Sequence, residues 1–178
     1  MDALKVFLDD TVAWNFIERL KFTKWLLSRS IGVSDPRVLI PHPLLSRMIV
    51  PTLREWQASM PEASEPHLWL GLLRCDDPRQ HIQRALELDP SNQMARCTLI
   101  DWILGDVEYS QHHFPEFYIG DPEADLAILA RAQHLTGLVE GQARKQVFLQ
   151  EITELRENAK AWIKAGAAVN KLLARLRD

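Results

Sequence analysis

The sequence predicts an all-α protein, an irregular array of helical hairpins that ends in one long helix. First, proline and glycine divide the 178 residues into segments in which apolar residues recur at helical spacing. Second, an Asp-Pro pair, which suits a helix start, occurs at 77–78 and again at 121–122. Third, the last part of the chain keeps a heptad pattern without proline. We expect a single helical domain over residues 1–178.

Residues 1–60 are predicted to form the N-terminal helices. Between Asp2 and Arg29 there is neither proline nor glycine, so we expect a long amphipathic helix with Asp2 as a candidate N-cap. The sequence is also compatible with a break in this helix near Trp14. The apolar positions at helical spacing are Leu4, Phe7, Leu8, Ile17, Leu20 and Trp25.

Prolines organise the stretch that follows. Residues 31–43 contain a glycine and three prolines and are predicted to be loop or extended chain. A helix is expected from Pro43 to about Met60, with Pro51 kinking or restarting it. Residues 61–66 are interpreted as a polar linker.

Residues 66–138 are predicted to hold repeat-like helix pairs. After a short apolar helix, Asp77 should cap a second helix, and Ser91 or Asn92 a third helix that ends at Gly105. Asp121 should cap another helix, and its Asp-Pro pair lies 44 positions after the first, within the period of helical repeats.

Within this region, residues 68–104 resemble a tetratricopeptide-repeat unit. The resemblance rests on the run Ala85-Leu86-Glu87-Leu88-Asp89-Pro90, and the matching positions are Ile82, Ala85, Leu86, Leu88 and Pro90. It implies stacked helix pairs, a small residue at Ala85 where two helices approach, and a groove that binds peptides or proteins. The chain departs from the family pattern at Pro78 and in an insertion at residues 106–120.

Residues 142–177 are predicted to form one long helix. Its heptad seam could pack on the rest of the chain or pair with a second copy, so both a monomer and a homodimer through this helix stay open. The small residues on the seam would permit close approach. The seam positions are Phe148, Ile152, Leu155, Ala159, Trp162, Gly166, Val169, Leu173 and Leu176.

Charge is distributed unevenly although the net charge is only −3. Residues 60–125 hold 13 acidic residues against four arginines, and the remainder holds 11 acidic and 17 basic residues. An acidic middle argues against a nucleic-acid binder and favours a basic protein partner. The sequence shows no membrane-spanning run, no signal peptide and only two cysteines, so we expect a cytoplasmic protein without a disulfide framework.

The segment between Trp102 and Asp121 combines aromatic and acidic side chains, as binding hot spots do. An alternative interpretation is that the aromatic residues of this segment only anchor a linker to the core. The predicted partner-binding residues are Trp102, Asp106, Glu108, Tyr109, His112, His113, Glu116, Phe117 and Tyr118.

No catalytic motif stands out, so we expect a non-enzymatic protein-binding module without metal or other cofactor. One form of this hypothesis is a bacterial immunity protein that blocks a cationic toxin, and another is an adaptor. The alternatives are a helical metal-dependent enzyme that uses His112, His113 and Glu116, and a structural oligomeriser that acts through the C-terminal helix.

Overall fold

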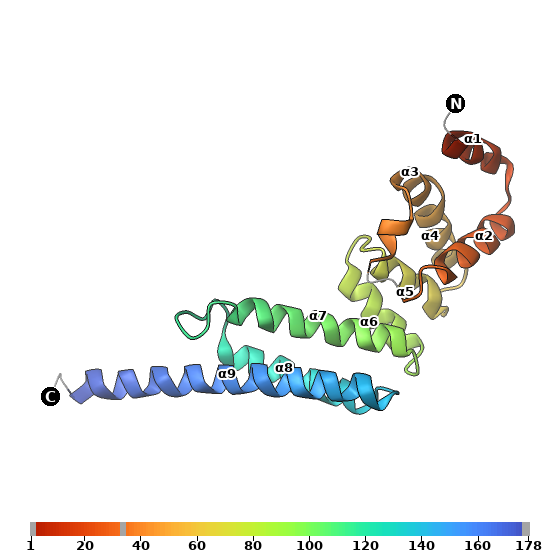
Figure 1. Cartoon of the computed structure of the whole chain (residues 1–178). Helices are drawn as coiled ribbons and strands as arrows, with labels where there is room; N and C mark the ends of the chain where they lie inside the picture. Colours follow the sequence, from red (N-terminus) through yellow and green to blue (C-terminus); the bar gives the residue numbers. More distant parts are fainter. Residues whose placement is uncertain (1–2, 33–34, 176–178) are drawn as a thin grey trace. The chain divides into compact units, whose positions relative to one another are not determined.

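The computed structural model describes residues 3–32 and 35–175, with side chains described as far as residue 166. This part of the chain is helical with connecting turns and contains no strand, which confirms the all-α prediction. Contacts divide the chain into two compact units, Met1–Ala95 and Arg96–Asp178. Figure 1 shows the order of the helices. The single domain expected from the sequence stays a prediction.

The first unit opens with α1 (Ala3–Asp10) and α2 (Phe16–Ser28), separated by a short 3-10 turn. The break near Trp14 is therefore present. Its cause is Asn15, whose side chain accepts from the Glu18 N–H while the Glu18 carboxylate accepts from the Asn15 N–H. This capping box starts a new helix. The proposed cap Asp2 lies outside the described residues.

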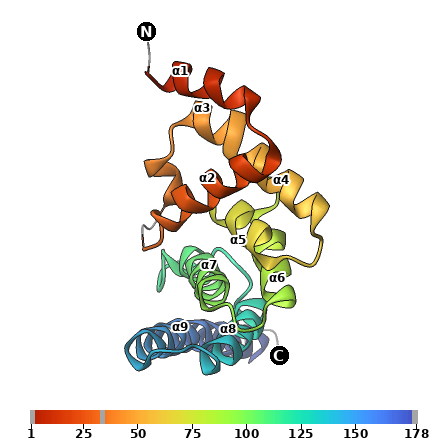
Figure 2. The same ribbon diagram turned by 90° about the vertical axis from the view of Figure 1, so that its right-hand side faces the viewer.

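Three short elements precede the next full helix of this unit (Figure 2). They are the 3-10 turn η2 (Pro36–Leu39), α3 (His42–Leu44) and the π-helical turn η3 (Leu45–Ile49). α4 (Val50–Ser59) then begins, with Pro51 in its first turn. Proline cannot donate to the carbonyl four residues earlier and clashes with it, so the wider π turn lets the chain continue. The helical chain therefore runs from His42 to Ser59 without a break at Pro51.

α5 (Ser64–Leu72) and α6 (Pro78–Leu88) form a helical hairpin. α5 begins within the stretch that was predicted to be linker, since Ser64 already lies in it. The predicted cap of α6 is confirmed, because the Asp77 side chain accepts from the Gln80 N–H at 3.1 Å. The buried core of the unit is drawn from α1 to α5 and the turns between them, and consists of Leu8, Leu27, Ile40, Leu44, Met48, Ile49, Leu53, Trp56, Trp69, Leu70 and Leu73.

The second unit is built from α7 (Gln93–Gln111), α8 (Pro122–Gly137) and α9 (Gln142–Arg175). Asn92 caps α7 by accepting from the Ala95 N–H at 2.9 Å. The prediction that this helix ends at Gly105 is wrong, because α7 continues to Gln111. A glycine costs about 1 kcal/mol in a helix, and burial of Val107 and Gln111 in the two turns that follow offsets that cost.

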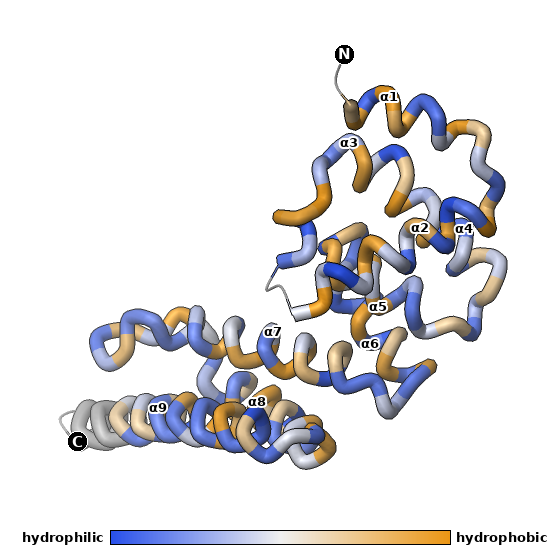
Figure 3. The backbone as a smooth tube through the Cα atoms, turned by 45° about the vertical axis from the view of Figure 1, so that its right-hand side comes forward, coloured by the Kyte–Doolittle hydropathy of each residue, from blue (hydrophilic) through white to orange (hydrophobic). Residues whose placement is uncertain are grey.

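α9 confirms the predicted long C-terminal helix, and its apolar and polar residues alternate along it (Figure 3). The seam is buried at Phe148, Ile152, Leu155 and Ala159. Gly166 is exposed, and a Cβ there would meet nothing within 4 Å, so none of the described residues approaches that position closely. The seam positions Val169, Leu173 and Leu176 lie outside the described side chains.

Candidate functional site

A cavity of about 410 Å³ lies between α7 and α9 in the second unit. Its α7 side is supplied by the last turn of that helix and the residue after it. Its α9 side is supplied by two successive turns. The residues that line it are Glu108, Gln111, His112, Glu151, Glu154, Leu155 and Asn158.

The spacing of these residues explains why they share one cavity. Side chains three and four positions apart lie on the same face of a helix. The α7 set has the spacing of 108, 111 and 112, and the α9 set that of 151, 154, 155 and 158. The buried seam residues beside the second set hold α9 against its unit, so its polar flank faces the cavity.

Three carboxylates give the cavity its charge. Burial raises the pKa of Glu151, and the nearby carboxylates of Glu108, Asp101 and Glu154 raise that pKa further. The Glu154 carboxylate accepts one hydrogen bond, from Gln150 Nε2 at 2.9 Å. No lysine or arginine is among the lining residues. Glu151 is half-buried and Glu108 and Glu154 are exposed, so the cavity gathers negative charge that attracts an entering cation, while Arg144 nearby partly offsets the charge on Glu151.

The wall of the cavity contains a buried polar network. Gln111 is only 5% exposed, and its Nε2 donates to the Leu155 carbonyl at 2.8 Å and to Tyr118 Oη at 3.1 Å. Tyr118 Oη in turn donates to Asp125 Oδ2 at 2.7 Å. These bonds fix the amide orientation, since the carbonyl of Leu155 needs a donor. Gln111 Oε1 is left buried, with no hydrogen-bond partner among the described residues.

Burial and the hydrogen bond to Asp125 raise the pKa of Tyr118 to about 12. The phenol therefore stays protonated and acts as a donor. It also packs against Trp162, with ring centroids 5.9 Å apart. Together with the backbone bond from the Ile119 N–H to the Ser110 carbonyl, this fastens the connection between α7 and α8 to its unit.

A row of exposed rings borders the cavity. Tyr109 is 66% exposed, and its ring stacks on His112 with centroids 5.1 Å apart. The His113 ring lies 3.9 Å from that of His112. His112 itself lines the cavity, and its Nδ1 is 2.7 Å from the Tyr109 carbonyl oxygen. We call Tyr109, His112 and His113 the ring row.

The residues predicted to bind a partner do not share one environment. Glu108 and His112 line the cavity, and Tyr109 and His113 join the ring row beside it. Tyr118 is buried and serves as the anchor expected in the other interpretation, so its ring is not offered to a partner. Trp102 is half-buried, whereas Asp106, Glu116 and Phe117 are exposed but do not line the cavity.

Four of the residues that line the cavity were not predicted from the sequence to bind a partner: Gln111, Glu151, Glu154 and Asn158. A signal was present, because Glu151, Glu154 and Asn158 are polar positions at helical spacing beside the heptad seam. The sequence does not show which other helix this flank faces. Gln111 gives no comparable signal, since glutamine is usually exposed.

Neither the metal alternative nor the cysteines supply a reactive centre in the described part of the chain. Within it, no group of three or more histidine, cysteine or acidic side chains could hold a metal ion. His112, His113 and Glu116, which the metal-dependent alternative requires, therefore form no such group. Cys75 and Cys97 are free, and burial raises the pKa of both thiols.

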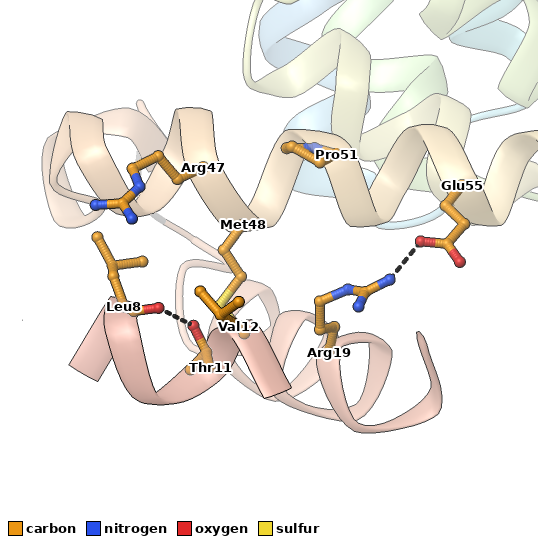
Figure 4. A pocket seen from close by; sticks show the side chains of 8 residues that line it. All are labelled: Leu8, Thr11, Val12, Arg19, Arg47, Met48, Pro51 and Glu55. Atoms are coloured by element: carbon orange, nitrogen blue, oxygen red, sulfur yellow. Dashed lines mark hydrogen bonds and ion pairs between the residues drawn. The ribbon is translucent and has the colours of Figure 1, made fainter. Parts of the chain in front are cut away.

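The first unit has a smaller cavity, of about 240 Å³ (Figure 4). Its arginines already have carboxylate neighbours, since Arg19 pairs with Glu55 and Arg47 lies 3.6 Å from Asp9. The Thr11 hydroxyl donates to the Leu8 carbonyl at 2.9 Å. These polar groups are therefore engaged within the unit, which makes this cavity the weaker candidate for binding a charged ligand.

No protein-family model, curated protein or solved structure matches the chain. Among the described residues, no helix is both long enough and apolar enough to cross a membrane. The cavity between α7 and α9 and the residues that line it are therefore the features of the molecule that bear on function.

Proposed function

We propose that the protein is a non-enzymatic protein-binding module whose cavity between α7 and α9 receives a cationic side chain of a basic partner. The observation that carries the proposal is the gathering of Glu108, Glu151 and Glu154 around a cavity whose lining contains no cation. Like charges held together raise the free energy of the empty site, and a partner cation relieves that repulsion.

A protein partner fits this site better than a catalytic role does. The acidic cavity is bordered by the exposed ring row, of which His112 also lines the cavity. Aromatic side chains beside a charged pocket are typical of protein interfaces. The alternative of a metal-dependent enzyme has less support, because His112, His113 and Glu116 form no group that could hold a metal.

The proposal extends to the biological role of the protein, its location in the cell and the arrangement of its helix pairs. An acidic cavity suits an immunity protein that blocks a cationic toxin, and it also suits an adaptor for a basic segment. A cytoplasmic location and a tetratricopeptide-repeat-like arrangement of the helix pairs belong to the same proposal. The α5–α6 hairpin, which carries the resembling residues, is consistent with such a pair.

Affinity capture with three versions of the tagged protein tests the proposal. The native protein should retain a basic partner at low salt and release it at high salt, because screening weakens charge pairing. A variant with Glu108→Gln, Glu151→Gln and Glu154→Gln should lose that partner. A control with Glu62→Gln, Glu123→Gln and Glu157→Gln removes as many charges outside the cavity and should keep it. Equal capture by all three versions would rule the cavity out as the binding site.

A further inference from the structure

We propose that the cavity between α7 and α9 selects arginine, so that the partner presents a guanidinium group rather than a lysine ammonium. This inference rests on the proposed function and specifies its ligand. Three independent features of the site favour a planar cation: carboxylates on two facing helices, the ring row, and the unpartnered oxygen of Gln111.

The carboxylates stand on both sides of the cavity. Glu108 belongs to α7, whereas Glu151 and Glu154 belong to α9. A guanidinium carries five N–H donors in one plane and can pair with carboxylates on opposite sides at the same time. An ammonium is a compact and strongly hydrated charge with three donors, so it satisfies fewer acceptors and gives up more hydration.

The ring row adds a surface that a flat group can cover. Tyr109 and His112 stack at 5.1 Å with an interplanar angle of 25°, and Tyr109 is largely exposed. Arginine stacks on ring faces through both charge and planar contact, and lysine lacks the planar contact. Because His112 also lines the cavity, an arginine guanidinium can lie against the rings while its N–H edges pair with the carboxylates.

Gln111 supplies the observation that is independent of charge. It is 5% exposed, it lies in the wall of the cavity, and its Oε1 accepts no hydrogen bond from the described residues. A buried carbonyl without a donor costs free energy, and that cost is recovered when a donor arrives. We expect a guanidinium N–H that enters beside Gln111 to supply this missing donor.

The test uses nuclear magnetic resonance titration of the full-length protein with three small probes. They are the N-acetyl methylamides of arginine, lysine and citrulline, and citrulline keeps nearly the shape of arginine without its charge. The arginine probe should shift the signals of residues 108–112 and 151–158. Its affinity should exceed that of the lysine probe about tenfold, a difference of about 1.4 kcal/mol. The citrulline probe should produce no shifts.

The outcomes separate this inference from the proposed function. Equal affinity for arginine and lysine at these residues would overturn the arginine selectivity and leave the cation-binding function standing. No shift with either cation, or shifts confined to other residues, would overturn both. Two variants provide matched controls. Tyr109→Ala should bring the two affinities close together, whereas Glu123→Gln, which lies outside the cavity, should leave the difference unchanged.

Discussion

The imidazole rings of His67 on α5 and His81 on α6 meet with their Nδ1 atoms 3.1 Å apart. At this distance one ring donates and the other accepts, so at least one ring is neutral. Burial lowers the pKa of both side chains. For His67 the charges of His81 and Arg84 add to this effect and Glu87 opposes it, whereas for His81 it is Asp76 and Asp77 that oppose it. The contact therefore joins the two helices only while no more than one of the two rings carries a positive charge.

We expect acid to weaken the first unit through this pair. The folded pKa values lie below the ordinary value of 6.5, so the unfolded chain binds more protons, and the stability is lost as pH falls from about 6.5 through the folded values. Urea denaturation at pH 7.5 and at pH 5.5 measures the loss. His81→Asn keeps a hydrogen-bonding group without the ionisation and should reduce the pH dependence. An unchanged dependence in that variant, or an equal reduction in the exposed control His42→Asn, would contradict the assignment.

Gly71→Ala should destabilise the same helix pair. A Cβ at this position would lie 2.6 Å from Cγ1 and 2.7 Å from Cδ1 of Ile82, and 3.0 Å from the Pro78 carbonyl oxygen. Overpacking of this kind costs about 2 kcal/mol. Gly105→Ala is the matched control, because its Cβ would meet nothing within 4 Å and should stabilise α7 by about 1 kcal/mol. Thermal denaturation compares them, and equal effects of the two substitutions would contradict the close approach.

The Tyr118 phenol should titrate near pH 12. The chain has two tyrosines, so the variant Tyr109→Phe leaves Tyr118 as the source of the phenolate absorbance. Because its folded pKa of about 12 lies above the ordinary 10, this group adds stability below pH 10 that is lost as pH rises towards 12. Tyr118→Phe should cost about 2 kcal/mol at neutral pH, since it strips Asp125 of its donor and Gln111 of an acceptor. A midpoint near 10 in the folded protein would show that the network does not hold the phenol.

Local signals in the sequence located the helix starts well. Asp77, Asn92 and Asp121 all accept hydrogen bonds from backbone N–H groups at the predicted places, because a cap depends on neighbouring residues alone. The end of α7 could not be located in the same way. Gly105 is a plausible stop, and only the tertiary burial of Val107 and Gln111 carries the helix past it.

The candidate site was predicted in part for a related reason. Glu108 and His112 lie in the segment 102–121, whose aromatic and acidic side chains predicted a binding surface. Glu151 and Glu154, which face them across the cavity, are more than 30 residues away in the sequence. The polar spacing on α9 shows that these residues share a face, not that the face meets α7. Tyr118 was predicted to bind a partner but is buried. An aromatic residue in a connecting segment can lie on the surface or in the core, and only its tertiary contacts determine which.

Binding of a cationic probe to the cavity should weaken on acidification through Glu151. Its folded pKa is raised above the ordinary 4.5 by burial, with Glu108, Asp101 and Glu154 adding to the effect and Arg144 opposing it. A bound cation favours the ionised carboxylate, so affinity should be full above the raised pKa and should fall as pH drops through it. Calorimetric titration with the arginine probe in a His112→Asn background measures this without the imidazole in the cavity. Glu151→Gln should lower the affinity at neutral pH and flatten its pH dependence, while Glu123→Gln should change neither, and an unaltered pH dependence in Glu151→Gln would show that another group controls binding.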